Sequence, residues 1–447
     1  MSFREIGLAG VLGSIVAAAA LAYAAAYAPI AAVATLAAIV LTVWMVTRAE
    51  LLLLVLVAAV PWEGMLDVPS ETVSVVKLLG ALLVIAYLFR ALTRAETLRF
   101  SPILLAGLVF AAFVALSLMA SADPAVGVAK TLRYAFFLLF LFLVTQLVDG
   151  EGTAYKLLRV LVVSTTLAAL YGLFGFLSGE AERAAGPVAD ANDFAFVIAT
   201  TLPLAALLLV EDRRLRWLWI ASLAILLAAS LATLSRGALV GLGALAVWAI
   251  ASRRVGVGGL FAAGLVVATL ATLALTLWAP LINERLELKQ RAGQSNIDSR
   301  LAFWSAASRM SLESPVLGIG PGRFGEEADR YLRNNPLVLP DPVVHNTYLE
   351  ILVENGIFAL IAFIAMLGIS WSALTRAETA ARHDDDLHRA RLAAAVKGAL
   401  VVAVVGGLFL SEQLSVPFWL GCGLAASGAL SGALTRTARA PRAAVAL

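Results

Sequence analysis

The sequence predicts an all-α, polytopic membrane protein, and three observations carry that prediction. Of its 447 residues, 61% are hydrophobic and only 14% are charged, whereas an ordinary soluble domain is about half apolar. Runs of the roughly 20 apolar residues that one membrane-spanning helix needs follow one another along most of the chain. The single cysteine, Cys422, lies inside the last run, so a disulfide framework is excluded.

The apolar runs predict about 12 to 14 membrane-spanning helices. They occupy residues 7–24, 29–47, 50–62, 73–92, 102–120, 128–148, 157–178, 192–210, 216–234, 237–252, 256–279, 346–372, 392–410 and 416–434. The run at 50–62 is short and ends in Pro61 and Trp62, which suits a half-helix. No small-residue cleavage site follows the first run, so we expect it to remain in the membrane as a span.

Charged residues between the runs predict the orientation of the chain. Every second connection is rich in arginine and lysine, whereas the alternate short connections are mainly acidic. By the positive-inside rule, both termini are then cytoplasmic. We therefore expect N-terminal transmembrane helices at 1–279, an outside loop at 280–345, and C-terminal transmembrane helices with a cytoplasmic tail at 346–447. The basic connections contain Arg48, Arg90, Arg94, Arg99, Lys156, Arg159, Arg213, Arg214, Arg216, Arg253, Arg254, Arg376, Arg382, Arg389 and Arg391.

The long outside loop has the pattern of a small folded cap. It carries as many acidic as basic residues, so it is not a polybasic lipid-binding segment. Within it, the stretch SNIDSRLAFWSAASRMSLESP predicts a short amphipathic helix that begins at Asp298 or Ser299 and ends before Pro315. Arg300 and Trp304 are four residues apart in this helix, a spacing that allows the two side chains to stack.

A glycine cluster follows this helix. Gly318, Gly320, Gly322 and Gly325 lie close together in PVLGIGPGRFG. Such spacing lets backbone N–H groups approach a ligand, or lets the chain fold tightly under the cap. The stretch lacks the Gly-Lys-Ser/Thr ending and the preceding strand of a P-loop, so a nucleotide-binding fold is excluded.

Two outside residues are candidates for chemistry. Arg236, in LSRGALVGL, lies between two apolar runs without an acidic neighbour in sequence. A guanidinium there suits a phosphate, and the alternative is an interfacial arginine that reaches lipid headgroups. His345 is the one histidine of three that falls outside. Its imidazole suits general-base work near neutral pH.

Polar residues also enter the membrane helix behind His345, in HNTYLEILVENG. Thr347 and Glu350 have the spacing of a capping box, which would explain Glu350 structurally. Glu354 lies deeper in the span and should face protein or water rather than lipid.

The chemistry that fits these residues is group transfer from an activated lipid. One cysteine and no second histidine near His345 exclude an obvious zinc site. Outside the cytoplasm there is no ATP, so a bond-forming enzyme there needs a preassembled activated substrate. A sugar on a polyprenyl diphosphate is such a substrate. It requires cations at the diphosphate and a base at the acceptor hydroxyl.

Five motifs in order resemble the bacterial O-antigen ligase and O-antigen polymerase superfamily. They are RAAGPVADANDFA, LSRGALVGL, SRLAFWSAA, PVLGIGPGRF and HNTYLEILVENG, and the resemblance covers roughly residues 180–372. It implies an all-helical, type C glycosyltransferase architecture in the bacterial inner membrane, with 280–345 in the periplasm. It also implies metal-independent, inverting transfer of a glycan from undecaprenyl diphosphate, with O-antigen ligation to lipid A-core favoured. We expect no cofactor and no nucleic acid partner.

The resemblance implies a role for each motif residue. Arg236 and Arg300 would bind the diphosphate, and His345 would act as base on the acceptor hydroxyl or orient it. Further substrate contacts are expected from Arg183, Asn192, Asp193, Lys130, Arg133, Asn346, Glu350, Glu354, Gly320 and Gly322. In this chain ADAND replaces the commoner proline before the asparagine, which leaves the shape of that turn open.

Other functions remain open at the level of sequence. A polymerase would extend a second lipid-linked glycan, and a protein ligase would glycosylate a protein hydroxyl by the same chemistry. A bicarbonate-type transporter would favour internal repeats and broken helices at the midplane, whereas here no repeat is visible and the polar residues gather at the outer face. A purely structural scaffold would not need that cluster.

Overall fold

The structure is a computed structural model. It describes residues 47–66, 74–94, 97–188, 190–254, scattered positions between 256 and 276, 297–332 and 342–430. The predicted span at 7–24, almost all of 29–47 and most of 256–279 lie outside the described residues. The same holds for 280–296 and 333–341 of the predicted loop, and for the tail from 431 onward.

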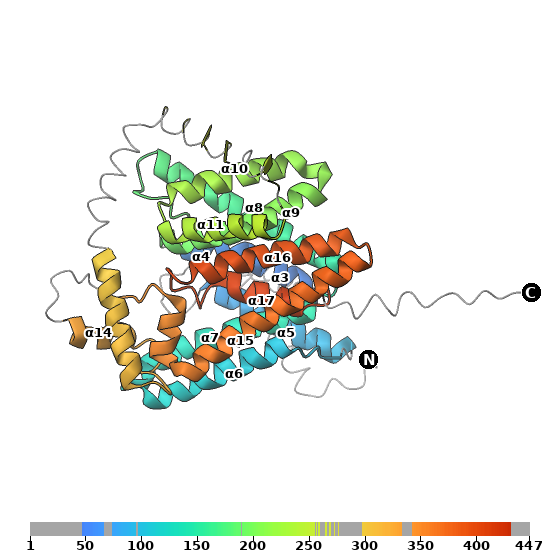
Figure 1. The fold of residues 1–447 in the computed structure, drawn as a ribbon. Helices are drawn as coiled ribbons and strands as arrows, with labels where there is room; N and C mark the ends of the chain where they lie inside the picture. Colours follow the sequence, from blue (N-terminus) through green and yellow to red (C-terminus); the bar gives the residue numbers. More distant parts are fainter. Residues whose placement is uncertain are drawn as a thin grey trace, which may run out of the picture. The chain divides into compact units, whose positions relative to one another are not determined.

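The described elements are helices, which confirms the predicted all-α membrane fold (Figure 1). Eight are long and apolar enough to cross a membrane, and two shorter apolar helices accompany them. The total of about 12 to 14 spans predicted for the whole chain stays a prediction. The helices are α3 (Ala49–Ala59), α4 (Glu63–Leu66), α5 (Val75–Arg94), α6 (Pro102–Ser117), α7 (Pro124–Leu147), α8 (Glu151–Leu177), α9 (Ala191–Glu211), α10 (Arg216–Ala232), α11 (Arg236–Ala251), α14 (Phe324–Leu332), α15 (Thr347–His383), α16 (Leu387–Gly406) and α17 (Val416–Ala426).

The run predicted as a half-helix is composite. Short 3-10 turn η1 (Val60–Trp62) joins α3 to α4, and the three together form one of the eight candidate spans, Ala49–Leu66. Pro61 lies in that turn, since proline lacks the N–H that would continue an α-helix.

The chain forms two compact units. The first comprises Met1–Leu52 and Ala81–Glu96, and within it Arg90 pairs with Glu50 at 3.1 Å. The second comprises Leu53–Gly80 and Thr97–Leu447 and contains every candidate site residue.

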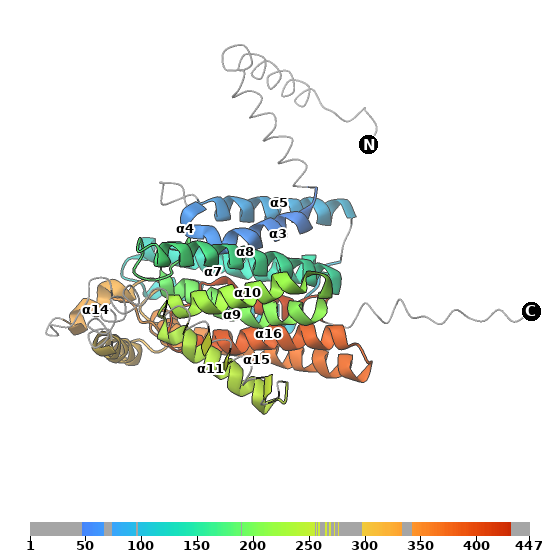
Figure 2. The ribbon, with the colours of Figure 1, turned by 90° about the horizontal axis from the view of Figure 1, so that it is seen from above.

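In the second unit, α15 packs between α6 and α16, and α16 also contacts α9, α11 and α17 (Figures 1 and 2). Aromatic rings fill the centre: Phe110 and Phe363 lie 5.4 Å apart, and Phe363 meets Phe418 edge-on at 5.6 Å. The bundle thus holds the start of α15 against several helices at once.

Side-chain caps define where these helices begin. Asp123, Asp190 and Asn346 each accept hydrogen bonds from the N–H groups of the following turn. A capped helix can therefore begin before its apolar run, because capping satisfies the unpaired N–H groups of a first turn. Thus α7, capped by Asp123, begins at 124 and not at 128. Helix α8 also begins early, at 151 and not at 157, although its N-cap Gly150 has no side chain to cap it.

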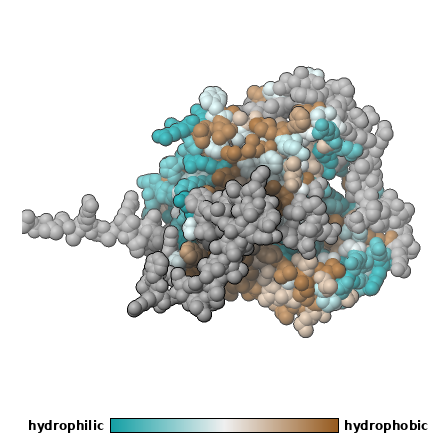
Figure 3. All heavy atoms as spheres, turned by 180° about the vertical axis from the view of Figure 1, so that it is seen from behind, coloured by the Kyte–Doolittle hydropathy of each residue, from teal (hydrophilic) through white to brown (hydrophobic). Residues whose placement is uncertain are grey.

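Surface hydropathy agrees with a membrane setting. On the face in Figure 3, hydrophobic side chains occupy the middle of the described helices, and hydrophilic ones gather toward the two ends. One end carries residues 297–332, the larger of the two described parts of the predicted cap (Figure 1).

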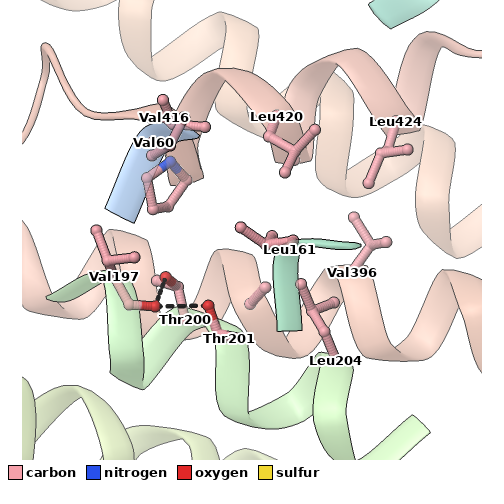
Figure 4. A pocket seen from close by; sticks show the side chains of 13 residues that line it. Val60, Leu161, Val197, Thr200, Thr201, Leu204, Val396, Val416, Leu420 and Leu424 are labelled. Atoms are coloured by element: carbon pink, nitrogen blue, oxygen red, sulfur yellow. Dashed lines mark hydrogen bonds between the residues drawn. The ribbon is translucent and has the colours of Figure 1, made fainter. Parts of the chain in front are cut away.

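A small cavity of about 30 Å³ lies among α8, α9, α16 and α17 (Figure 4). Its polar side chains, Thr200 and Thr201, donate to the carbonyl of Val197 in their own helix. Their hydroxyl protons are used within α9, so the cavity has an effectively apolar lining.

Candidate functional site

The cap packs onto the start of α15 through an apolar cluster. Residues 297–313 form the predicted amphipathic helix, and Pro315 follows its end. The helix already includes residue 297, so neither Asp298 nor Ser299 is its N-cap. The cluster contains Phe303, Ala306, Ala307, Met310, Phe324, Ala328, Leu332, Val344 and Val353.

His345 stands at the junction of cap and bundle, in a constrained backbone. Its φ is 52°, in the left-handed region, which costs an ordinary residue roughly 1–2 kcal/mol. On one side, the indole Nε1 of Trp304 donates to the carbonyl of Val344 at 2.8 Å. On the other, Asn346 caps α15 by accepting from the N–H groups of Tyr348 and Leu349. These hydrogen bonds fix the backbone on both sides of His345 and so limit where its imidazole can lie.

The capping box predicted for Thr347 and Glu350 is wrong. Asn346 is the cap, and the Thr347 hydroxyl donates instead to the carbonyl of Leu410 at 2.9 Å. The Thr347 N–H donates to the carbonyls of Gly407 and Leu410. These bonds tie the start of α15 to the connection between α16 and α17, a tertiary contact that local spacing cannot reveal.

Three arginines converge beside this connection. Arg300 donates from Nη1 to the carbonyl of Phe409 at 3.3 Å. Burial lowers the pKa of Arg300, and the nearby cations Arg236 and Arg183 lower it further, while Asp190 raises it. Like charges brought together in this way favour an anionic ligand, since an anion would relieve their repulsion.

Arg183 fastens its loop to the turn that carries Arg236. Its Nε donates to the carbonyl of Thr233 at 2.7 Å, and its Nη2 donates to Oδ1 of Asn192 at 2.8 Å. Burial lowers the pKa of Arg183. Arg236 itself is exposed as the first residue of α11. There its charge adds to the positive end of the helix dipole, which is a favourable place for a phosphate.

His345 lies within reach of the same charges. Burial lowers its pKa, and Arg300 lowers it further, against smaller opposing effects of Asp190 and Glu350. The imidazole is therefore neutral at neutral pH and able to accept a hydrogen bond or proton.

Lys130 was predicted to contact substrate, but in the structure its ammonium group forms ion pairs with two carboxylates. Its Nζ lies 2.6 Å from Oε1 of Glu350 and 2.6 Å from Oε2 of Glu354. Gln413 also donates to Glu350 at 2.5 Å. Both glutamates are buried, which confirms that Glu354 faces protein rather than lipid. We therefore assign this buried group to bracing α15, because it links α7, α15 and the 407–413 connection.

The glycine cluster is explained by close backbone approach under the cap. The N–H groups of Ile319 and Gly320 donate to the carbonyls of Val353 and Glu354. A Cβ on Gly318 would meet the backbone of Glu354 at 2.4 Å, and one on Gly320 would meet the Cβ of Ser121 at 2.5 Å.

Opposite this segment, α15 is broken at Gly356. The backbone there has φ 80° and ψ 176°, and a Cβ would meet the carbonyl oxygen of Val316 at 2.0 Å. The N–H of Ile357 then donates to the carbonyl of Pro315 at 2.9 Å. The cap segment thus replaces hydrogen bonds that the helix gives up at the break. Gly322 lies against Lys130, and its N–H donates to the Glu354 carboxylate.

The structure also brings in residues that sequence reasoning missed or only mentioned. Asp190, the cap of α9, lies within electrostatic range of both Arg300 and His345. Glu412 and Gln413, in the connection after α16, are 3% and 2% exposed. The predicted contacts Asp193 and Arg133 lie together, both exposed, beside this connection. The signal that could have found Glu412 and Gln413 was two polar residues in sequence between apolar runs on the predicted outer side.

Among the described residues, no group of three histidine, cysteine or acidic side chains is arranged to hold a metal ion. The features of the site are guanidinium groups, one neutral imidazole and carboxyl groups at one end of the bundle.

Part of the chain matches a known protein family. Residues 221–364 match the family model described as O-antigen ligase. This segment contains Arg236, Arg300 and His345, so the predicted resemblance to the O-antigen ligase superfamily is confirmed for it. No curated protein matches the chain.

Proposed function

We propose that this membrane protein, with its O-antigen ligase segment at 221–364, is a periplasmic-side glycosyltransferase of the bacterial inner membrane. It moves a glycan from undecaprenyl diphosphate to an acceptor hydroxyl, with lipid A-core as the favoured acceptor. The observation that carries the proposal is the convergence of Arg183, Arg236 and Arg300 beside His345.

The arginines supply the donor side of the reaction. As the bond between the sugar and the diphosphate breaks, negative charge develops on the leaving diphosphate. Cations that are already in place stabilise that charge without reorganising, which is usually the largest catalytic contribution. Arg300 is held by the Phe409 carbonyl and Arg183 by Thr233 and Asn192, so both are preorganised, while exposed Arg236 remains available to the ligand.

His345 supplies the acceptor side. Its neutral imidazole can hold the acceptor hydroxyl, as its base or by orienting it, while the oxygen attacks the anomeric carbon. The fixed backbone at Val344 and His345 limits the positions that the ring can take. Direct attack opposite the leaving diphosphate inverts the configuration at that carbon.

An apolar groove of about 470 Å³ supports a lipid-linked donor. It lies between α15 and α16 and begins at Tyr348, three residues after His345. Its lining is apolar apart from the rings of Tyr348 and Trp371, which suits a hydrocarbon chain. It consists of Tyr348, Ile364, Leu367, Gly368, Trp371, Leu400, Val401, Val404, Val405 and Leu408.

A reconstituted transfer assay tests the proposal. The purified protein in liposomes receives an undecaprenyl diphosphate-linked glycan, with lipid A-core as acceptor in one reaction and only further lipid-linked glycan in the other. Product on lipid A-core that disappears in His345→Ala would establish the ligase. Chain extension in the second reaction would identify a polymerase. No histidine-dependent product in either reaction would refute both and return the transporter and the protein ligase to consideration.

A further inference from the structure

A carboxyl pair, Asp193 and Glu412, has no catalytic part in the proposal so far, although Asp193 directly follows Asn192, which accepts a hydrogen bond from Arg183. The two side chains are in hydrogen-bond contact. Asp193 is exposed in the first turn of α9, whereas Glu412 is 3% exposed behind it. The pair therefore has one member open to a substrate and one enclosed by protein.

Glu412 is placed at the site by its backbone. Its N–H donates to the hydroxyl of Thr347, two residues after His345, at 2.8 Å. The same connection accepts the Arg300 bond at Phe409 and donates from Gln413 to Glu350. Glu412 thus belongs to the segment that holds both the diphosphate arginine and the start of α15.

The surroundings of Glu412 favour its neutral form. Glu412 interacts with Asp193, Asp190 and the hydroxyl of Ser415, and none of these is a cation. Burial, together with repulsion from Asp193, raises the pKa of Glu412 well above its ordinary value. Its Oε1 is buried without a hydrogen-bond partner. A buried, ionised carboxylate without a cation or full hydrogen bonding is costly, and a second nearby carboxylate adds to that cost, so these surroundings favour a proton on Glu412.

Asp193 faces different neighbours. Arg133 approaches it from α7, and the N-cap Asp190 lies on its own helix. Burial and Asp190 oppose the charged form of Asp193, whereas a hydrogen bond from Glu412 and the cation Arg133 favour it. The division of roles follows from this asymmetry, since the exposed member is the carboxylate and the buried member is its hydrogen-bond donor.

We propose that Asp193 is a further catalytic residue of the transfer reaction proposed above, held in place by protonated Glu412. The acceptor O–H bond breaks as its oxygen forms the new bond to the anomeric carbon. The electron pair of the broken sugar–oxygen bond leaves with the diphosphate, and the proton passes to the Asp193 carboxylate and then to water. His345 then orients the hydroxyl rather than taking its proton.

Isosteric substitutions in the reconstituted assay test this inference, which rests on the proposed function. Asp193→Asn should lower kcat on the order of 10² to 10⁴, the usual effect of losing a general base, with KM for the lipid-linked donor little changed. Glu412→Gln should keep the rate within several-fold, because its amide can donate to Asp193 as the protonated acid does. Wild-type activity should fall at alkaline pH as Glu412 loses its proton, and Glu412→Gln should lose that decline.

The outcomes separate the two proposals. Asp123→Asn, which removes a carboxylate from the cap of α7 and leaves an equally good cap, is the matched control and should be active. Active wild type with an equally active Asp193→Asn would overturn the role of Asp193 and leave the transferase intact. Loss of activity in Glu412→Gln equal to that in Asp193→Asn would overturn the donor role of Glu412. An inactive wild type would overturn the transferase itself. Partial rescue by Asp193→Glu separates loss of the base from misfolding.

Discussion

His345 shows how one residue can be prepared for chemistry by its neighbours. Trp304 holds the carbonyl before it, Asn346 caps the helix after it, and its own φ is 52°. Residues kept in unfavourable backbone conformations cluster at functional sites, because the surrounding structure must stabilise them. The pKa of the ring is lowered by burial and by Arg300, so its neutral form is the one that meets substrate.

The pH profile of transfer should report this state of His345. Because its folded pKa lies below the ordinary value of 6.5, the ring stays neutral as pH falls to that value and protonates only below it. We therefore expect an acid limb in kcat/KM whose midpoint lies under about 6.5. His345→Gln should lose that limb together with most activity, whereas His383→Gln, a histidine at the opposite end of α15, should keep both. An unchanged acid limb in His345→Gln would assign the titration to another group.

At the residue scale, sequence reasoning found candidates but not their partners. Arg236 stood out because it lies between two apolar runs without an acidic neighbour, His345 as the one outside histidine, and Arg300 through the motif that it shares with the O-antigen ligase superfamily. The structure brings these three together. Lys130 was expected to contact substrate as well, yet it pairs with Glu350 and Glu354. Residues 130, 350 and 413 are far apart in sequence, and only the packing of α7, α15 and the 407–413 connection joins them. Periodicity and spacing carry no information about such contacts.

The buried group around Lys130 should be a large contributor to stability. Lys130→Met leaves Glu350 and Glu354 buried without their cation, and breaking a buried pair in this way costs about 3–5 kcal/mol. We expect a clear fall in the Tm of the protein in detergent, measured by intrinsic fluorescence. Lys77→Met, at an exposed position of α5, should leave Tm unchanged. Adding Glu354→Gln to Lys130→Met should recover part of the loss, and no recovery would show that the charge is not the cause.

At the scale of elements, the junction between the cap and α15 depends on backbone approach. The 315–320 segment donates to and accepts from the break in α15, and glycines stand where a side chain would collide. From sequence, the glycine cluster predicted either a ligand loop or tight folding under the cap, and the structure shows the second. The break at Gly356 was not predicted: residues 346–372 were interpreted as one span, although Glu354, Asn355 and Gly356 interrupt the apolar residues there.

Gly356→Ala tests the importance of this junction. Its Cβ would lie 2.0 Å from the Val316 carbonyl oxygen, and its positive φ alone would cost alanine about 1–2 kcal/mol. We expect a lower Tm and easier proteolysis of the cap in liposomes. Gly243→Ala in α11, where a Cβ meets nothing within 4 Å, should behave as wild type. Equal stability of both variants would mean that the junction contributes little.

At the scale of the whole molecule, the prediction of the fold and of the orientation came mainly from hydrophobic composition and the distribution of charge. The apolar runs located the described helices, but not all of their ends: α15 continues to His383, although its run ends at 372, and α8 begins at 151, although its run begins at 157. The ends that carry Arg183, Asn192 and Arg236 were expected on one side, and their hydrogen bonds and charges do bring them together. The positive-inside rule predicts that these ends face the periplasm.

Single-cysteine labelling tests the orientation. The one native cysteine, Cys422, is buried, so background labelling should be low. Ser308→Cys, exposed on the cap helix, should react in intact spheroplasts with a membrane-impermeant maleimide. Asp384→Cys, exposed at the end of α15, should react only after the membrane is permeabilised. The reverse pattern would place the cap in the cytoplasm and remove the basis for a periplasmic reaction.

The most direct test of the central claim is the transfer rate of Arg236→Ala and Arg300→Ala in the reconstituted assay. If these guanidiniums stabilise the leaving diphosphate, each variant should insert and fold normally but lose on the order of 10² to 10³ in kcat. The control is Arg216→Ala, which removes an exposed arginine from the first residue of the neighbouring helix α10, and it should keep the wild-type rate. Full activity of Arg236→Ala or Arg300→Ala would contradict the account of how this site works.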